Sequence, residues 1–418
     1  MSLQDEIIAL AVAARQAARH LVTMTGAARN AALYALADAL DAQRAVVMQA
    51  NAEDLAQAQR DGLAGPMLAR LTLTEKKYAQ MTEGVRAVAA QTDPVGETLA
   101  GYNRPNGLRI EKRRVPLGVV GIIFESRPNV TIDAAALCLK SGNACLLRGG
   151  KESIRTNAAL AQIIGQALPQ AGVPAAAVQV ITTTDRAAVT AMATATGYID
   201  LLIPRGGEGL IRAVTASATV PVIKHYRGVC HVYVDAGADL AMAERIAVSA
   251  KADGVSLCNT AECLLVHESV AATFLPRVAA LLAERKVELR CDARALKYLP
   301  TATPATDSDW GAEFLDYIYA VKVVTSLTEA ITHINTYSSQ HTDAIITQDL
   351  AAAERFTTEV DSASVMVNTS TRFADGQEYG LGAEIGISTD KLHSRGPMGA
   401  ADLCTYKWVV TGSGQIRV

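Results

Sequence analysis

The sequence is poor in aromatic residues and in charge of either sign. Aromatic side chains make up 5% of the 418 residues, charged ones 19%, and the formal net charge is −3. Because nucleic acid or an anionic membrane attracts an excess of Lys and Arg, this balance gives no electrostatic footprint for either partner. Half of the residues are hydrophobic, which excludes a disordered chain. The length of the chain predicts about two to three domains.

Long apolar runs and paired cysteines are also missing. No run approaches the roughly 18 residues of a membrane-spanning helix. Residues 1–6 are polar and acidic, and apolar residues then recur at helical spacing, which indicates an amphipathic helix and not a signal peptide. The seven cysteines are odd in number and include no Cys-x-x-Cys pair. We therefore expect reduced thiols, a cytoplasmic protein and no metal site.

The first hundred residues carry a helical pattern, and an extended segment follows it. Apolar residues in 31–40 repeat at three- and four-residue steps, as in an amphipathic helix. The Pro-Asn-Gly of 105–107 predicts a turn before the alternating segment 108–114. We expect a two-stranded arm there, and a strand over 406–410 near the end of the chain.

From residue 115 onward, short apolar segments alternate with helical ones. The pattern predicts strands over 119–124, 144–147, 178–181, 199–203, 220–223, 263–266, 319–324, 344–347 and 364–368. It predicts helices over 132–140, 153–168, 185–196, 240–252, 270–285, 328–336 and 350–360, with another opening at 206–209. Such alternation with short loops predicts an α/β fold with parallel sheets covered by helices on both faces.

Cys258 is the strongest candidate nucleophile. It follows an Ala-rich helical segment, and polar Asn259 and Thr260 come directly after it, so it lies at an element end where functional groups concentrate. A thiolate stabilised by a helix end or a cation is a strong nucleophile. The alternative is a small buried residue. Other cysteines fit that alternative better because they lie within apolar patterns: Cys138, Cys145, Cys263 and Cys404.

Two glycine turns suggest a phosphate-binding surface. Arg-Gly-Gly at 148–150 and Pro-Arg-Gly-Gly-Glu-Gly at 204–209 each connect a predicted strand to a helix. Amides at a helix N-terminus suit phosphate oxygens, and each arginine adds charge. Neither turn has the Gly-x-Gly-x-x-Gly spacing, so two ordinary strand–helix connections remain an alternative.

Polar residues crowd the segment 224–231, Lys-His-Tyr-Arg-Gly-Val-Cys-His, after the predicted strand 220–223. The carboxyl ends of parallel strands are where sites form. The adjacent Cys230 and His231 have no second pair of matching spacing, which argues against a metal site. Nothing in the sequence singles out His333 or His341.

Long sequence blocks carry a family resemblance. They lie at 115–131, 140–143, 147–152, 228–235, 258–262, 341–347, 368–373, 380–389 and 395–399, and include Val-Pro-Leu-Gly-Val-Val-Gly-Ile-Ile-Phe-Glu-Ser-Arg-Pro-Asn-Val-Thr and Cys-Asn-Thr-Ala-Glu. Over nearly the whole chain they resemble the aldehyde dehydrogenase superfamily and, within it, the branch that acts on γ-glutamyl phosphate.

The resemblance implies a fold with three parts. These are a Rossmann-type cofactor-binding domain (1–100 and 119–231), an α/β catalytic domain (232–394) and a β-strand oligomerisation arm (101–118 and 395–418). A homo-oligomer is expected because the strands of the arm would be unpaired sheet edges in a monomer.

The resemblance also assigns roles to single residues. It implies Cys258 as nucleophile and Asn129 as oxyanion-hole amide. It places Arg148 where relatives bind the adenosine ribose, and Glu313 where they bind the nicotinamide ribose. Residue chemistry adds further cofactor candidates, Lys151, Arg205, Gly206 and Gly207. It also adds substrate or phosphate candidates, Arg127, His225, Arg227 and Arg372.

The implied reaction is the NADPH-dependent reduction of L-glutamyl 5-phosphate to L-glutamate 5-semialdehyde through a cysteine thioester, a step of proline biosynthesis. The partners expected from the resemblance include, besides the substrate, the glutamate 5-kinase that makes it, in a transient complex. The alternatives are another aldehyde dehydrogenase, acylating or hydrolytic, or a non-catalytic scaffold of the same fold. Hydrolytic relatives carry a general-base Glu on the strand before the nucleophile, whereas residues 224–231 contain no carboxylate.

Overall fold

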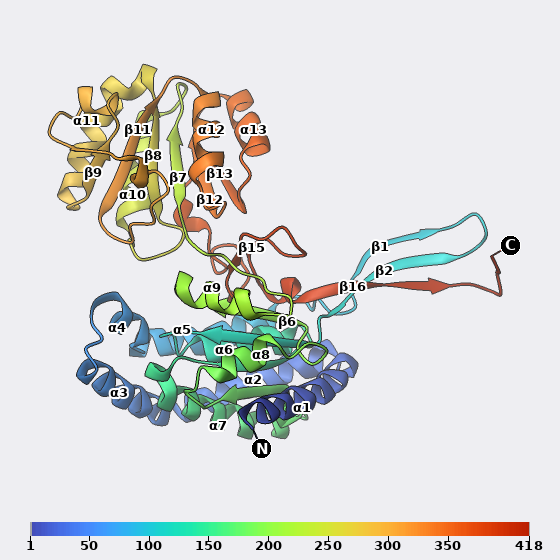
Figure 1. Ribbon diagram of the computed structural model, residues 1–418. Coiled ribbons are helices and arrows are strands. Elements are labelled where there is room, and N and C mark those ends of the chain that lie inside the picture. Colours follow the sequence, from blue (N-terminus) through green and yellow to red (C-terminus); the bar gives the residue numbers. More distant parts are fainter. Residues whose placement is uncertain (1, 418) are drawn as a thin grey trace.

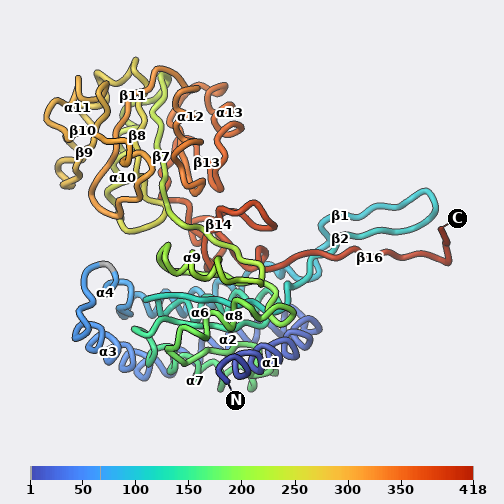
Figure 2. Tube along the Cα trace, in the orientation of Figure 1, coloured from blue at the N-terminus to red at the C-terminus, as the bar shows by residue number. Residues whose placement is uncertain are grey.

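Two α/β units lie one above the other in the computed structural model, which describes residues 2–417, and a long arm projects from their side (Figures 1 and 2). Both units contain parallel sheets with helices against them. The α/β class expected from the sequence is therefore confirmed. None of the helices in residues 2–417 is long and apolar enough to cross a membrane.

The chain begins with a helical layer, as its periodicity predicts. Its helices are α1 (Leu3–Thr23), α2 (Gly26–Ala42), α3 (Arg44–Arg60), α4 (Gly65–Leu71) and α5 (Glu75–Ala90). Ser2 and Asp5 form a capping box at the start of α1, which satisfies backbone N–H groups that no helical carbonyl can reach. The apolar stripe Leu33, Leu36 and Leu40 of α2 is buried in the core of the lower unit.

The lower sheet is parallel, with the strand order β5-β4-β3-β6. Its strands are β3 (Val119–Phe124), β4 (Ala144–Arg148), β5 (Val178–Ile181) and β6 (Leu201–Arg205). The associated helices are α6 (Val130–Lys140), α7 (Ile154–Gln170), α8 (Ala187–Ala193) and α9 (Glu208–Ser217). The direction of winding reverses between β3 and β6, and ligands of such sheets bind at the carboxyl ends of the strands beside that point.

One predicted strand does not form. Residues 220–223 make only an isolated bridge to β6, in which Leu202 donates to the Pro221 carbonyl and Ile223 donates back to Leu202. Proline has no N–H to continue a ladder. The polar segment 224–229 therefore follows no strand. It is an irregular connector that leads into β7 (Cys230–Val234), the first strand of the upper sheet.

The upper sheet is also parallel, in the order β10-β9-β11-β8-β7-β12-β13. Its other strands are β8 (Ala261–His267), β9 (Glu288–Cys291), β10 (Thr303–Pro304), β11 (Ile318–Val324), β12 (Thr342–Ile346) and β13 (Ser364–Val367). Helices α10 (Leu240–Ala252), α11 (Glu268–Glu284), α12 (Leu327–Tyr337) and α13 (Leu350–Glu359) cover it. The sequence missed β9 and β10 because these short strands at the sheet edge lack an apolar run.

After β13 the chain returns to the lower unit. It forms the small antiparallel pair β14 (Ile387–Ser388) and β15 (Gly396–Pro397), and Ile385, Met398 and Leu403 enter the lower core. This return passes between the two units (Figure 1). Single turns of 3-10 helix occur at Lys151–Ser153, Ala175–Ala177, Ala295–Lys297, Asp307–Asp309, Thr371–Phe373 and Ala400–Leu403. The expected domain ranges themselves stay a prediction.

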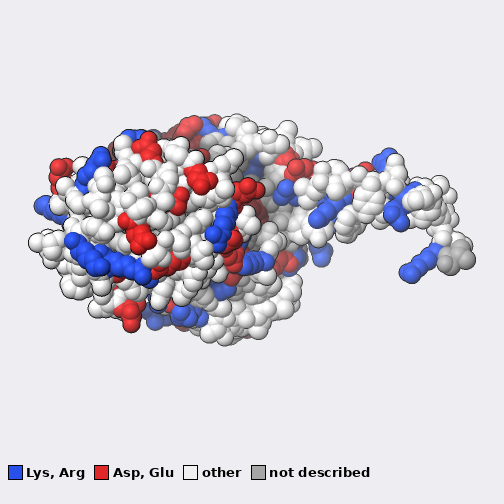
Figure 3. All heavy atoms as spheres, turned by 90° about the horizontal axis from the view of Figure 1, so that it is seen from above, with Lys and Arg blue, Asp and Glu red and all other residues white. Residues whose placement is uncertain are grey.

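The arm is a three-stranded antiparallel sheet, not a two-stranded one. Strand β2 (Arg109–Pro116) lies between β1 (Thr98–Asn103) and β16 (Cys404–Thr411). The expectation that the segment 107–114 would be an unpaired edge is therefore wrong, since β2 is paired on both sides and the edges are β1 and β16. Seen from above, the arm extends well away from the body (Figure 3). Apolar and aromatic side chains are exposed on it: Tyr102, Tyr406, Trp408 and Val410.

We expect the arm to hold subunits together, because exposed aromatic residues on an edge strand favour a partner surface. Trp408→Asp should convert the oligomer into smaller species in sedimentation velocity. Leu350→Asp is the matched control, since Leu350 is also apolar and is 82% exposed on α13, away from the arm. A wild-type chain that sediments as a stable, active monomer would contradict this prediction.

Candidate active site

The carboxyl edge of the lower sheet faces the amino edge of the upper one. The lower unit contributes the residues that follow β3 and β6 to this region. The upper unit contributes the turns that precede β7, β8 and β12. Arg127, which follows β3, lies close enough to Cys258, which precedes β8, for their charges to interact. The candidate residues therefore meet between the two units.

Cys258 lies in the turn 254–260, between α10 and β8. All seven cysteines are free thiols; Cys258 is partly exposed and the other six are buried, including the four that the sequence placed in the core. Gly228 packs directly against the backbone of Cys258, and a Cβ at Gly228 would lie 2.0 Å from the Cys258 carbonyl oxygen. Only glycine allows this approach, so the connector before β7 holds the thiol turn in place.

A second contact fixes the other side of the thiol turn. The Nδ2 of Asn259 donates to the carbonyls of Arg372 and Ala374, at 3.2 and 3.0 Å. The amide of Asn259 thus ties the turn to the chain after β13. It also brings the Arg372 guanidinium near the thiol, where a Cys258 thiolate would favour its charge.

Arginines surround the thiol. The pKa of Arg127 is lowered to about 10, mainly by burial and also by the neighbouring Arg205 and Arg70, whereas a Cys258 thiolate and Glu384 act in the opposite direction. Burial also lowers the pKa of Arg372. Both guanidinium groups remain charged at neutral pH, so the site presents positive charge to an anionic substrate.

The backbone after β3 is bent sharply to place Arg127. Ser126 has a φ of 46°, in the left-handed region that non-glycine residues seldom adopt. Both its N–H and its hydroxyl donate to the same Glu152 oxygen, at 2.5 and 2.8 Å. Glu152 therefore stabilises the turn that carries Arg127 toward the upper unit.

Two histidines lie beside the thiol. One imidazole nitrogen of His225, one of His341 and the Sγ of Cys258 all lie within 4.8 Å of one another. The sequence offered His225 only as a phosphate ligand, and it did not single out His341. That residue is fully buried at the start of β12, and burial lowers its pKa to about 4. Its imidazole is therefore neutral at pH 7 and takes up a proton less readily than an ordinary histidine.

The two glycine turns of the lower sheet have different surroundings. The N–H of Gly207 donates to Glu125 Oε2 at 3.0 Å, and the Arg205 guanidinium lies beside Glu384 and Gly386, at 3.8 Å from the Glu384 carboxylate. This turn therefore faces the thiol side. Gly149 packs so tightly that a Cβ would lie 2.0 Å from Asn157 Nδ2. The turn 148–150 thus brings its backbone close to the start of α7.

Arg148 is nearly buried at the carboxyl end of β4. Its Nη2 donates to the Thr184 carbonyl at 3.1 Å, and its Nε has no partner within the described residues. A cavity of about 250 Å³ lies beside the neighbouring 3-10 turn. It is lined by Asp54, Gln57, Ala58, Asp61, Leu63, Met67, Lys151, Glu152 and Arg155. The structure therefore places Lys151 on a partly apolar recess.

Three further candidates have defined partners. The Oε1 of Glu313 accepts from the Gly228 N–H at 2.8 Å, and burial raises the pKa of Glu313. Glu313 thus contacts the connector residue that packs against the thiol turn. Asn129 donates to Asp133 at 2.9 Å at the start of α6. Arg227 is ion-paired with Glu208, at 2.7 Å and about half exposed, so the connector places it against α9.

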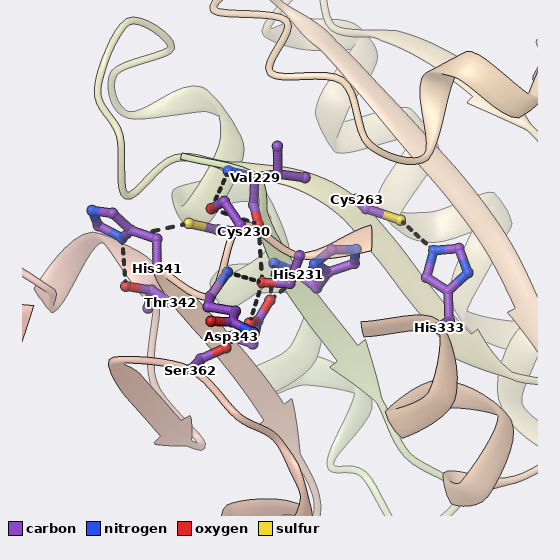
Figure 4. Close-up of polar contacts among 12 residues, drawn as sticks. Val229, Cys230, His231, Cys263, His333, His341, Thr342, Asp343 and Ser362 are labelled. Atoms are coloured by element: carbon purple, nitrogen blue, oxygen red, sulfur yellow. Dashed lines mark hydrogen bonds and ion pairs between the residues drawn. The ribbon is translucent and has the colours of Figure 1, made fainter. Parts of the chain in front are cut away.

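A second cluster of similar composition lies deeper in the upper unit (Figure 4). His231, Cys263 and His333 bring one donor atom each within 4.8 Å of one another, and all three are buried. His231 Nδ1 lies 2.9 Å from Asp343, and Cys263 Sγ lies 3.8 Å from His333 Nε2. The alternation along β7 separates this cluster from the thiol site, because adjacent residues on a strand point to opposite faces.

Known proteins resemble this chain over its full length. The aldehyde dehydrogenase family model matches residues 2–305. γ-Glutamyl phosphate reductase of Opitutus terrae is 55% identical over 420 aligned residues, with 99% of each chain covered. That of Geobacter metallireducens is 51% identical, with both chains fully covered. The crystal structure of γ-glutamyl phosphate reductase from Thermotoga maritima matches with a TM-score of 0.96 at 42% identity, over 99% of this chain and 100% of that one.

Proposed function

Because the chain belongs to the aldehyde dehydrogenase family, we propose that it reduces L-glutamyl 5-phosphate to L-glutamate 5-semialdehyde, with NADPH as reductant and release of phosphate. This is a step of proline biosynthesis. The observation that carries the proposal is the Cys258 thiol among arginines and neutral imidazole, in a chain whose full-length relatives are named γ-glutamyl phosphate reductases.

The first step forms a thioester. Cys258 Sγ attacks the acyl carbon of the substrate, the bond from that carbon to the bridging phosphate oxygen breaks, and phosphate departs as an anion. The thiol proton passes to the imidazole of His225, one nitrogen of which lies within 4.8 Å of the Cys258 Sγ. Phosphate is a good leaving group and needs no proton, so no separate general acid is required at this step.

The surrounding charges fit the substrate. A glutamyl phosphate carries a phosphate and an α-carboxylate, and Arg127 and Arg372 both lie close enough to Cys258 for their charges to interact with a thiolate. We assign these two arginines to the substrate anions. The backbone N–H of Cys258 and the amide of Asn129 are the oxyanion donors of this proposal. The second Nδ2 hydrogen of Asn129 serves, since one is donated to Asp133.

A dinucleotide fits the lower unit. The unpartnered buried Nε of Arg148, the close-packed turn after β4 and the cavity with Lys151 and Arg155 together offer cations and an apolar wall. We assign Arg148 and Lys151 to the nucleotide phosphates and Glu313 to the nicotinamide ribose. When bound, NADPH supplies the hydride that reduces the thioester. The protein holds the thioester carbonyl in the oxyanion site, and loss of the thiolate then frees the aldehyde.

Arg148→Ala should raise the KM for NADPH about ten- to a hundredfold, and the KM for NADH much less. An arginine gives the 2′-phosphate a charge-assisted, two-pronged contact that NADH cannot use. Initial rates with both nucleotides measure this. Lys151→Ala is the companion variant, because Lys151 is the other cation at the turn. Equal increases for both nucleotides would show that Arg148 acts only through its bond to Thr184.

The function itself is tested by NADPH absorbance in the presence of glutamyl phosphate, generated in place from glutamate and ATP by an added kinase. We expect oxidation that depends on the kinase and on ATP. Acetyl-CoA in place of the kinase system is the control. Turnover with the acyl-CoA alone would indicate an acylating aldehyde dehydrogenase, and turnover with neither donor would indicate a scaffold.

A further inference from the structure

We propose that Cys258, His225 and His341 also form a binding site for a soft divalent cation, with Zn²⁺ as the type ion, which reversibly blocks the nucleophile. In this proposal a metal ion binds to residues of the active site and inhibits the enzyme. It does not depend on the identity of the acyl substrate, because it needs only the thiol and the two imidazoles.

The donor set and its spacing suit zinc. One sulfur and two imidazole nitrogens can supply three protein ligands to a zinc ion, and a water molecule then takes the fourth position. The three donor atoms lie within 4.8 Å of one another. A tetrahedral zinc needs about 3.5 Å between a sulfur and a nitrogen ligand, so side-chain movements of about 1 Å bring them onto the ion.

Both imidazoles already have the supporting contacts of metal ligands. His225 Nδ1 lies 2.8 Å from the Ile387 carbonyl, to which it can only donate, so the lone pair of the neutral ring is on Nε2. His341 Nδ1 is bonded to the Thr342 hydroxyl at 2.9 Å. The His341 Nε2 is buried without a partner within the described residues. A hydrogen bond to the second ring nitrogen orients a histidine ligand.

The buried cluster of His231, Cys263 and His333 provides a contrast. Lys322 Nζ lies 3.2 Å from His333 Nδ1, and an ammonium can only donate. The proton of His333 is then on Nε2, which faces the Cys263 sulfur. That cluster is closed off from solvent, whereas Cys258 and His225 are partly exposed. The metal should therefore prefer the thiol site.

Metal binding at this site is a simple exchange. The Cys258 thiol loses its proton to solvent, a sulfur–metal bond forms, and the two imidazoles replace two waters of the ion. No oxidation is involved, so a chelator restores the free thiol. While the ion is bound, the sulfur lone pair is not available to attack an acyl carbon.

The first test uses the wild-type protein, Zn²⁺ alone and no substrate or nucleotide. The rate at which iodoacetamide alkylates Cys258 is followed by mass spectrometry. At a zinc concentration one hundred times the Kd, about one site in a hundred is free, so alkylation should slow about a hundredfold. EDTA should restore it. An alkylation rate that zinc does not change would overturn the proposal, whatever the outcome of the turnover assay.

The second test locates the ion with Co²⁺, whose thiolate charge-transfer absorbance reports a cobalt–sulfur bond. The band should appear with one equivalent, disappear in Cys258→Ser, weaken in His341→Gln and persist in the matched control Cys263→Ser. A band that survives Cys258→Ser and is lost in Cys263→Ser would place the metal in the buried cluster and overturn the assignment. The alkylation test needs no substitution, so it decides the question even if a variant misfolds.

Discussion

Cys258→Ser should lower kcat by about 10⁴-fold or more while NADPH binding is retained. A serine hydroxyl holds its proton far more tightly than a thiol does, so an imidazole that takes up the thiol proton forms very little alkoxide from serine. The nucleotide contacts proposed for Arg148 and Lys151 lie on the lower unit, so they should not change. Stopped-flow turnover and nucleotide fluorescence titration measure the two effects separately.

The matched control for this variant is Cys263→Ser, because Cys263 lies on β8, the strand that follows the Cys258 turn, but is buried in the upper unit. It should keep most of the activity. Mass spectrometry of the wild-type enzyme mixed with glutamyl phosphate, without NADPH, should find the acyl group on Cys258. Near-normal turnover in Cys258→Ala would refute the assignment and turn attention to Cys230, whose sulfur lies 3.3 Å from the Cys258 carbonyl.

The fold was predictable where burial alone decides the local structure. Strand β3 was predicted with its observed bounds because a parallel strand covered on both faces has to be a continuous apolar run. The predicted strand 220–223 has the same apolar character, but Pro221 removes a donor and the bridge ends after one pair. The pairing of β16 with β2 depends on residues about 290 positions apart, which no local pattern indicates.

The candidate site was predictable in part, for a different reason. Cys258 stood out because polar residues follow it at an element end. His341 did not stand out, since a single histidine before a strand is common and its role depends on β12 lying beside β7. Glu384, which interacts with Arg127, enters from an irregular loop that has no periodicity. One local signal was available, namely that polar residues directly precede three strands of the upper sheet.

The carboxylates of the site decide whether water can accept the acyl group of the thioester, because water needs a base and phosphate does not. Glu313 accepts from the Gly228 N–H, and Glu384 accepts from the Gly376 N–H at 2.8 Å and lies 3.8 Å from Arg205. Both are therefore already hydrogen-bonded within the protein. A carboxylate that activates water must be able to take up a proton from it. We assign Glu313 and Glu384 to these structural contacts and not to the activation of water.

In the oxidative direction, glutamate semialdehyde with NADP should therefore give steady NADPH formation only when phosphate is present. Phosphate is already an anionic nucleophile at neutral pH, so it needs positioning charge, which Arg127 and Arg372 offer, and no base. Arsenate should replace it because its shape and charge are similar. Without either anion, the enzyme should form at most about one NADPH per site and stop as the acyl-enzyme. Rapid-mixing absorbance measures the burst, and mass spectrometry the acyl group.

Two variants make this prediction specific to the missing base. Glu313→Gln and Glu384→Gln each remove one carboxylate from the site while preserving its shape. At saturating NADP, which offsets any loss of the ribose contact proposed for Glu313, neither variant should alter the small phosphate-free rate if neither carboxylate activates water. If the wild-type enzyme instead turns over steadily to glutamate without phosphate, and one of these variants abolishes that rate, the carboxylate it lacks is the water-activating base. The chain would then be a hydrolytic aldehyde dehydrogenase, and the phosphate of the proposed substrate would have no place in its reaction.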